Sequence, residues 1–528
     1  MDNWVLAAAW AIALGLALLQ AGSVGAAETG QATNTRTGEA YAELSRAIAE
    51  AADGDRIELG SGTYEGSFKI GTRITLIGID TGGGTPIIDG AGETVVLDVT
   101  APGTSIEQLA ITSTGAPARP WGFLTPYGEE ACLMVAADDV SIAGNAITGC
   151  GQGVYVRNTS GAVIYHNRVE DNHIGGIFFL NSRNATVSAN TVRNNGYQGI
   201  TVQTFSFPPG IEHSYRAGKL VGDWWKVTYE SRDMADIISE QITISGNVVS
   251  GHGSGGIMVG FARRISALAN TVQENGGAPP SEIDVAYYGD IAANPLGRGF
   301  GIALFCDAYD NIVADNLVRR NDNHGIDVAS ALNNRIERNV VEGSDWGIMI
   351  QGSFGNRIED NIVTGNAEYG LRIETSRILD EPFLPSVANW ILRNSLVNPG
   401  VNAFDQSSGD RNGPSQSWRD VAAIKRTPPY PADTLNHWDD GTRGNHYGDF
   451  DEAAEGFVDT NTDGIGEVEH PIAGGSAVDH FPLAMGAHDA LTGEAGPAMA
   501  PATVGQAGCG HPPACGALSP PSGTCPVG

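Results

Sequence analysis

The sequence predicts an all-β protein folded as a single-stranded parallel β-helix, in which short strands stack coil upon coil. Two columns of residues recur in step, and most steps are 22 or 23 residues long. At about 3.3 Å per strand residue, such a unit suits one turn of a β-helix. Apolar residues alternate with others within the units, whereas a helix would space them three and four apart.

The first column is an asparagine followed two residues later by Val, Ile or Leu. Its members are Asn145, Asn167, Asn190, Asn247, Asn270, Asn316, Asn339, Asn361 and Asn394. Asparagine tolerates left-handed backbone, and its amide can bond the equivalent amide one coil away. We therefore expect a structural turn ladder and assign no chemistry to these residues.

The second column is a glycine followed by an apolar residue that opens a strand. Its members are Gly153, Gly176, Gly199, Gly256, Gly301, Gly325, Gly347 and Gly370. A unit this short cannot bury its apolar face alone, so the units must stack on one another. A solenoid core grows with each repeat, and we therefore expect one long domain over residues 54–400.

The composition limits the partners. The chain has 528 residues, with 30 basic against 61 acidic side chains and a net charge of −31. A charge of this sign argues against nucleic acid as a partner. Calcium or a saline setting would bind or screen it.

The first 27 residues are typical of a secretory signal. The apolar run Val5–Leu19 is followed by small residues up to Ala27, and cleavage is expected near Ala26 or Ala27. An uncleaved anchor is the alternative. The signal predicts a secreted or periplasmic protein with no membrane contact after cleavage. In the segment 28–53, an amphipathic helix over Tyr41–Ala52 is expected to cap the open end of the solenoid.

Four segments interrupt the repeat and are expected to wall one strand face: 113–130, 205–240, 276–299 and 376–389. Long loops on a rigid scaffold often carry binding or catalysis. These loops and neighbouring strands supply aromatic and basic groups suited to sugar rings. The predicted substrate-binding residues are Trp121, Trp224, Trp225, Lys226, Arg264, Tyr287, Tyr288 and Trp346. Loops that only cover the sheet or mediate oligomers are the alternative.

A catalytic group is predicted on the walled face. His324, Asp327 and Arg372 are expected within about 10 Å, because coils stack about 4.8 Å apart, and Tyr197 and His252 lie a few coils away. A base, an acid and a cation in one groove suit proton abstraction beside a sugar carboxylate, with Arg372 countering the enolate charge. The alternative is that His324 only caps a turn.

Two stretches carry a resemblance to known proteins. Residues 53–66, with Ile74-Thr-Leu-Ile-Gly and Ile87-Ile-Asp-Gly, resemble the opening coils of secreted right-handed β-helix proteins, the carbohydrate-binding and sugar-hydrolase group that includes pectate-lyase-like and NosD-like proteins. Residues 436–450, 458–467 and 479–483 resemble the closing segment of NosD-like proteins, so 401–484 is predicted to be a NosD-like C-terminal segment.

The resemblance implies a right-handed helix and three functions. The first is a polysaccharide lyase or epimerase acting on an acidic polysaccharide. Alginate epimerases carry Asp-Pro-His-Asp on such a strand, and here the match stops at Asp327. The second is a glycoside hydrolase, which needs two carboxylates about 5 to 10 Å apart, with Asp307, Asp310 and Asp327 as candidates. The third is a non-enzymatic maturation or surface-binding protein.

One metal site is predicted in the C-terminal segment. Asp459, Asn461 and Asp463 precede Gly464 like the start of a calcium loop, and Glu467 or, alternatively, Glu469 can complete the oxygen ligands. An unliganded Asx-turn is the alternative. Copper is not expected, because His437, His446, His470 and His480 are scattered and copper needs clustered His, Met or Cys ligands.

The six cysteines predict no particular pairing. Cys132, Cys150 and Cys306 are most simply small buried residues, and Cys509, Cys515 and Cys525 lie in an Ala, Gly and Pro-rich tail over 485–528, which is expected to be flexible.

Overall fold

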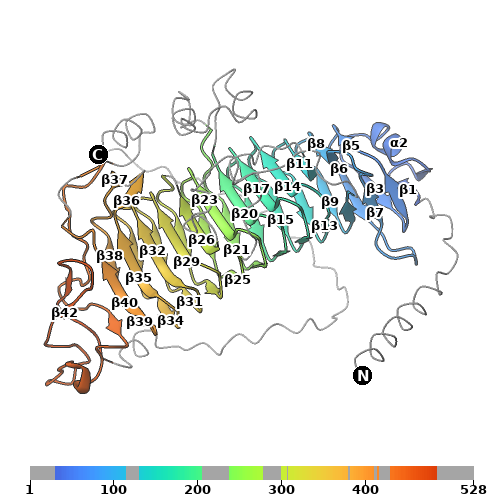
Figure 1. Ribbon diagram of the computed structural model, residues 1–528. Coiled ribbons are helices and arrows are strands. Elements are labelled where there is room, and N and C mark those ends of the chain that lie inside the picture. The colour runs from blue at the N-terminus through green and yellow to red at the C-terminus, as the bar shows by residue number, and fades with distance from the viewer. Residues whose placement is uncertain are drawn as a thin grey trace, which may run out of the picture. The chain divides into compact units, whose positions relative to one another are not determined.

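The computed structural model describes residues 30–113, 130–204, 237–276, 299–305, 307–378, 381–409, 413–414 and 429–484. These residues form a parallel β-helix of three long sheets (Figure 1). Within one coil the chain passes through sheet 1, sheet 2 and sheet 3 in turn, and strands pair in parallel with their equivalents in the neighbouring coils. At the N-terminal end of sheet 1 the first strand, residues 32–34, instead pairs antiparallel with both of its neighbours. The predicted all-β parallel solenoid is confirmed.

Sheet 1 has fourteen described strands, in the order β2 (Glu39–Tyr41), β1 (Ala32–Asn34), β3 (Asp55–Leu59), β6 (Ile74–Gly78), β9 (Ser105–Glu107), β12 (Ser141–Ala143), β15 (Val163–Tyr165), β18 (Thr186–Ser188), β21 (Thr243–Ser245), β24 (Ser266–Leu268), β27 (Ile312–Ala314), β30 (Arg335–Glu337), β33 (Arg357–Glu359) and β38 (Trp390–Leu392). Sheet 2 has thirteen among the same residues: β4 (Thr63–Glu65), β7 (Ile87–Asp89), β10 (Ala110–Thr112), β13 (Ala146–Thr148), β16 (Arg168–Glu170), β19 (Thr191–Arg193), β22 (Val248–Ser250), β25 (Thr271–Gln273), β28 (Leu317–Arg319), β31 (Val340–Glu342), β34 (Ile362–Thr364), β39 (Ser395–Val397) and β41 (His446–Tyr447).

Sheet 3 carries the candidate site. Its twelve described strands are, in chain order, β5 (Phe68–Ile70), β8 (Val95–Val99), β11 (Ala131–Val135), β14 (Gln152–Arg157), β17 (Gly175–Leu180), β20 (Gln198–Gln203), β23 (Gly255–Gly260), β26 (Phe300–Phe305), β29 (His324–Ala329), β32 (Trp346–Gln351), β35 (Tyr369–Glu374) and β40 (Val401–Asp405). Two antiparallel hairpins join β36 (Ser376–Ile378) to β37 (Glu381–Leu384) and β42 (His470–Pro471) to β43 (Val478–Asp479). A 3-10 turn, η3, spans Ala453–Glu455.

The predicted N-terminal helix is shorter than expected: α2 spans Leu44–Ala49. Its Leu44, Ala47 and Ile48 side chains are buried in the main core. That α2 caps the end of the solenoid stays a prediction. Within the described part of the chain, no helix has the length and apolar character needed to cross a membrane.

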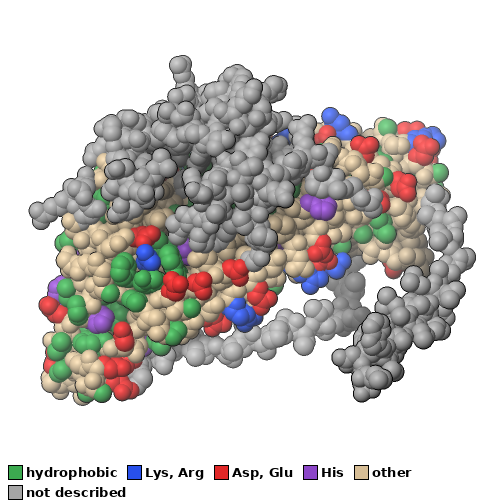
Figure 2. All heavy atoms as spheres, viewed as in Figure 1, with side chains coloured by type: hydrophobic (Ala, Val, Ile, Leu, Met, Phe, Trp, Pro, Cys, Tyr) green, Lys and Arg blue, Asp and Glu red, His purple; other side chains and the backbone are tan. Residues whose placement is uncertain are grey.

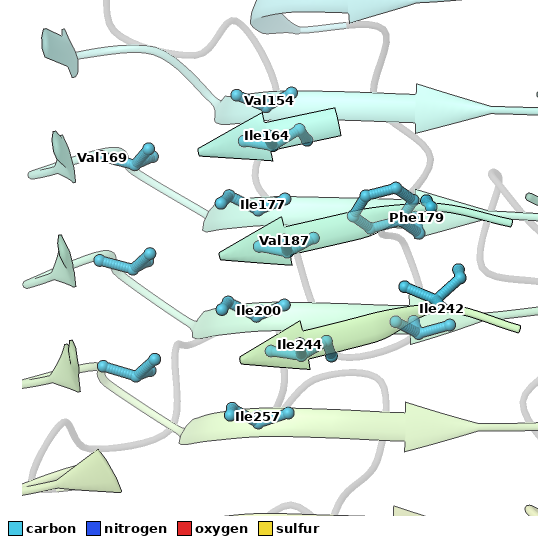
Figure 3. Packing of buried hydrophobic residues seen from close by; sticks show 14 of the residues in the cluster. Val154, Ile164, Val169, Ile177, Phe179, Val187, Ile200, Ile242, Ile244 and Ile257 are labelled. Atoms are coloured by element: carbon cyan, nitrogen blue, oxygen red, sulfur yellow. The ribbon is translucent and has the colours of Figure 1, made fainter. Parts of the chain in front are cut away.

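The core is a set of columns that run along the inside of the solenoid. Ile164 pairs with Val187, and Ile177 pairs with Ile200, one coil apart, and all are at most 1% exposed (Figure 3). Because equivalent inward residues lie in register, each coil buries its apolar face on the next. The period of 22 to 23 residues therefore sets the strand register.

The predicted asparagine ladder is confirmed. The backbone N–H and the Nδ2 of each ladder asparagine donate to Oδ1 of the asparagine one coil later, as from Asn145 to Asn167 at 2.9 and 3.0 Å. The last predicted member, Asn394, donates in the same way to Asn445 at 2.9 and 3.0 Å. The backbone N–H of Asn445 then donates to the Asp479 carboxylate at 2.7 Å, so this carboxylate ends the ladder.

A second interior ladder runs parallel to the first, mostly five residues later in the chain. Its members are Asn172, Asn195, His252, Asn275, Asn321, Ser344, Asn366 and Asn398. Each side chain accepts the backbone N–H of the preceding member, so the turns before sheet 3 are satisfied from inside the coil.

Candidate active site

The candidate site lies on the outer face of sheet 3, over three consecutive strands: β29, β32 and β35. Two columns of outward side chains meet there in parallel register. The first contains His324, Trp346 and Tyr369, and the second contains Asp327, Met349 and Arg372. The parallel pairing thus brings together His324, Asp327 and Arg372, as the sequence predicted, and Trp346 lies among them.

The backbone at Gly325 explains why His324 and Asp327 share one face although they are three residues apart. Gly325 and the fully buried Ile326 both face the interior. A Cβ at position 325 would lie 2.3 Å from Val341 Cγ1, so only glycine fits there. This extra inward residue shifts the alternation of the strand and returns Asp327 to the side of His324.

His324 and Asp327 form a buried pair. Nδ1 of His324 lies 2.8 Å from Oδ2 of Asp327, and the two residues are 1% and 2% exposed. An ionised carboxylate only accepts, so the proton of a neutral His324 sits on Nδ1 and Nε2 carries the lone pair. Nε2 is buried and has no hydrogen-bond partner. A ring held in this tautomer with a free Nε2 is suited to take a proton.

Trp346 lies between His324 and Arg372 rather than presenting a free ring face. Its ring stacks on the His324 ring at 4.9 Å between centroids, and the Arg372 Cζ lies 4.5 Å from its centroid. Its Nε1 donates to Glu368 at 2.7 Å. The structure therefore places Trp346 between the His324 imidazole and the Arg372 guanidinium, whereas the sequence suggested that it stacks on sugar.

Arg372 is already engaged. Its Nε and Nη2 donate to Glu374 at 3.0 and 2.7 Å, and the guanidinium also lies over the rings of Tyr369 and Phe404. Glu374 neutralises its charge inside the protein. The sequence suggested that Arg372 supplies a free positive charge to an enolate. This geometry does not provide such a charge.

An acidic edge borders the first column and is formed by Asp322, Asp345 and Glu368, all exposed. In parts of the surface acidic and basic side chains lie next to each other (Figure 2), and Arg338 and Asp315 form such a pair at 2.8 Å. By contrast, Asp322 and Asp345 form no ion pair with any described residue. Partial desolvation, then the Glu368 and Asp322 charges, raises the pKa of Asp345, and His324 opposes the rise.

His252 belongs to the second interior ladder and is fully buried. Its Nδ1 accepts the backbone N–H of Asn195 at 3.1 Å, and its Nε2 lies 3.1 Å from the carbonyl of Val192. Burial lowers its pKa to about 4. Both ring nitrogens are used inside the coil, so the structure gives His252 a turn-ladder role in place of the predicted catalytic one.

Two further predicted residues lie apart from His324. Tyr197 precedes β20, three strands of sheet 3 away from β29, which is roughly 14 Å at the usual coil spacing. Arg264 follows β23 and lies 3.6 Å from Glu240, which also pairs with Arg263. Neither is brought to the candidate site by the described residues.

Other predictions fall outside the described residues. They concern the signal segment 1–27, the tail 485–528, Cys306 and the loop residues Trp121, Trp224, Trp225, Lys226, Tyr287 and Tyr288. For the same reason, the predicted walling of sheet 3 stays a prediction. The fourth loop is partly described and contains the β36–β37 hairpin.

The predicted calcium segment forms consecutive Asx-turns. Asn461 Oδ1 accepts the backbone N–H of Asp463 at 3.0 Å, and Asp463 Oδ1 accepts that of Ile465 at 2.9 Å. Asp459 and Glu467 accept from Gly464 and Thr460. Over the described ranges, no group of three His, Cys, Asp or Glu side chains is placed to hold a metal ion. Calcium binding here stays a prediction.

Cys132 and Cys150 form a disulfide, with Cα atoms 5.5 Å apart. The sequence suggested two separate buried cysteines instead. Cys132 occupies the place in β11 that glycine takes in later coils, and Cys150 donates its backbone N–H to Asn172 at the start of the second ladder. The bond therefore ties sheet 3 to the turn that precedes it in the next coil.

Sequence reasoning left Asp345, Glu368 and Glu374 out of the candidate site. The repeat step of 22 or 23 residues could have placed Asp345 and Glu368 at the site, because it maps Asn323 onto Asp345 and Asp345 onto Glu368. Glu374 follows Arg372 by two residues and so shares its face.

Comparisons with known proteins agree with the resemblance found in the sequence. A family model described as periplasmic copper-binding protein (NosD) matches residues 210–452, and one described as right-handed beta helix region matches 125–214. A probable ABC transporter binding protein NosD from Pseudomonas aeruginosa is 35% identical over 121 residues, which is 22% of this chain and 26% of that protein. The chain thus matches about a quarter of the length of this relative. The predicted right-handed β-helix and the NosD-like character are confirmed.

Solved structures with a similar architecture have low identity. The A-module of mannuronan C-5 epimerase AlgE6 from Azotobacter vinelandii has a TM-score of 0.41 and 14% identity, covering 67% of this chain and 88% of that one. An alpha-1,3-glucanase catalytic unit from Streptomyces thermodiastaticus has a TM-score of 0.43 and 13% identity, covering 69% and 61%. Nothing about the activity of this chain follows from likeness at this level.

Proposed function

We propose that the protein is a carbohydrate-active enzyme that processes a polysaccharide on the outer face of β29, β32 and β35. The observation that carries this proposal is the buried Nε2 of His324, which has no partner while Asp327 fixes the other nitrogen. The structural histidine His252, by comparison, uses both ring nitrogens inside the coil. His324 is therefore assigned the role of general base.

The proton that Nε2 takes depends on the reaction. In a lyase or epimerase it comes from the sugar carbon next to a carboxylate, and charge builds up on that carboxylate. In a hydrolase it comes from water, whose oxygen attacks the anomeric carbon while the glycosidic C–O bond breaks and the leaving oxygen gains a proton from an acid.

Two observations favour hydrolysis over the elimination suggested by the sequence. Elimination needs a cation for the carboxylate charge, and Arg372 is paired with Glu374. Hydrolysis needs a proton donor, and Asp345, with its raised pKa, lies next to Trp346 at the edge of the site. Asp345 is the candidate acid, and it replaces Asp307 and Asp310, which lie in the turn after β26.

A non-enzymatic role is the second candidate, because the NosD family model matches 243 residues, from 210 to 452. That family is described as copper-binding, and such a role would require copper ligands beyond the described residues. The Cys132–Cys150 disulfide supports an oxidising compartment, so we place the protein in the periplasm or outside the cell under either candidate.

The test is a panel of neutral, amino-bearing and acidic polysaccharides, with reducing ends and unsaturated ends followed together. New reducing ends that disappear in His324→Ala would support hydrolysis, and unsaturated ends would support the lyase. A folded wild-type protein that cleaves nothing but binds copper tightly would favour the NosD-like role.

A further inference from the structure

We infer that the glycan accepted at this site carries no anionic groups, so that its sugars are neutral or bear amines. This inference rests on the proposed function and names the substrate class of the same site. Three observations support it: the charge around His324, the placement of the acidic edge and the hydrogen-bonding character of Nε2.

The described charges around His324 are predominantly negative. Glu374 neutralises Arg372, and Asp327 is held by His324. Asp322, Asp345 and Glu368 remain, and no described cation pairs with any of them. Mutual repulsion between these carboxylates contributes to the raised pKa of Asp345. A polyuronate on this edge would add like charges at close range, which disfavours binding.

The acidic edge follows the solenoid axis, beside the column of His324 and Trp346. Its backbone is in register from coil to coil: the N–H of Glu368 donates to the carbonyl of Asp345 at 2.8 Å. The Asp345 and Glu368 carboxylates are therefore about one coil apart, near 4.8 Å, and Asp322 lies one residue before the equivalent position of the preceding coil. A polysaccharide chain that follows the axis past His324 would meet this edge along several sugar units.

The tautomer of His324 gives an independent reason. In the neutral imidazole, where Nδ1 donates to Asp327, Nε2 can only accept a hydrogen bond. A sugar hydroxyl or amine can donate to this buried nitrogen. A carboxylate or sulfate oxygen placed against Nε2 has no proton to donate and would leave this nitrogen unsatisfied. The buried polar atom and the exposed acidic edge thus select the same kind of ligand.

The test is binding of size-matched neutral, amino-bearing and uronic-acid oligosaccharides to the full chain, by calorimetry at low salt with chelator and then with calcium. Asp345→Asn/Glu368→Gln removes two edge charges. Glu65→Gln/Glu93→Gln removes two exposed charges far along the chain and is the matched control. Neutral or amino-bearing sugars should bind wild type at least tenfold more tightly than uronic-acid sugars, and the edge variant should gain about fivefold for the latter, with no gain in the control.

Uronic-acid sugars that bind wild type as tightly as neutral ones, with chelator or with calcium, would overturn the inference. So would an edge variant that behaves like the control. If uronic-acid sugars bind and react in a His324-dependent way, the proposed function stands and only the substrate class fails. If a folded protein binds none of the three classes, the proposed function itself fails.

Discussion

His324 and Asp327 lie three residues apart on one strand, and Nδ1 of the imidazole is 2.8 Å from Oδ2 of the carboxylate. The geometry depends on position 325, where only glycine is small enough to face the interior beside Val341. The strand thus places a carboxylate and an imidazole in contact within four consecutive residues. Stacking of Trp346 from the next coil then holds the ring.

The first prediction concerns the tautomer of His324. In Asp327→Asn the amide can donate to Nδ1, which moves the ring proton to Nε2 and removes the base. Cleavage should fall by about 10²- to 10⁴-fold, close to the loss in His324→Ala. Nitrogen chemical shifts of the imidazole should report the changed tautomer. An unchanged tautomer with full activity would contradict the assignment.

The second prediction treats Trp346 as a positioning residue. Trp346→Ala removes the ring between His324 and Arg372, whereas Trp346→Phe keeps a ring and loses only the Nε1 bond to Glu368. We expect kcat to fall at least tenfold in the alanine variant with KM little changed, and the phenylalanine variant to keep most of kcat. The His324 ring proton shifts should move in step. A loss confined to KM would instead indicate sugar stacking on Trp346.

The third prediction separates His252 from catalysis. His252→Asn supplies the residue that occupies this ladder elsewhere, so activity should be retained and the unfolding free energy little changed. His252→Ala orphans the buried N–H of Asn195 and the carbonyl of Val192 and should cost about 1–3 kcal/mol. Denaturant unfolding and the cleavage assay measure both. Inactivity of a stable His252→Asn protein would restore the catalytic interpretation.

The repeat made the fold predictable, because a fixed step places equivalent residues in register without any knowledge of the loops. The same step also contained the role of His252: it follows Asn247 by five residues, as Asn172 follows Asn167 and Asn195 follows Asn190. Because His252 was interpreted as a reactive group, its place in this ladder was not recognised. The site was predictable as a set of outward residues, since period-two alternation orders them along each strand.

The partners of those outward residues were harder to predict. The pairing of Arg372 with Glu374 and the sandwiching of Trp346 depend on rotamers and on which neighbouring coil each side chain leans toward. The Cys132–Cys150 bond likewise needs a turn that brings residues 18 positions apart together. None of these three contacts follows from the spacing of residues in the sequence alone.

The fourth prediction concerns that disulfide. Reduction, or replacement of both Cys132 and Cys150 by alanine, should lower the unfolding free energy of the N-terminal coils by about 2–4 kcal/mol. Hydrogen exchange should show a loss of protection in β11 and β13, whereas protection in β32 and β35 should be unaffected. Equal loss of protection in all four strands would mean that the solenoid unfolds as one unit.

The last prediction follows from the end of the asparagine ladder. Asp479 accepts hydrogen bonds from the Asn445 and Phe481 N–H groups and from the Tyr447 hydroxyl, yet burial raises its pKa to about 7. An aspartate in the unfolded chain titrates near pH 4, so between about pH 4 and 7 the folded state holds a proton that the unfolded state lacks. The associated stability is fully present below about pH 4 and is lost as pH rises to about 7, by at most about 4 kcal/mol.

Asp479→Asn should remove this pH dependence while Oδ1 of the amide still accepts from Asn445, in the manner of every earlier ladder member. Denaturation midpoints measured at pH 5 and pH 8 should therefore differ less in Asp479→Asn than in wild type, and the variant should gain most, relative to wild type, at pH 8. Glu65→Gln, at an exposed position, is the control for general charge effects. If wild type and Asp479→Asn change in parallel between the two pH values, the carboxylate is ionised in the folded protein throughout, and its three donors outweigh its burial.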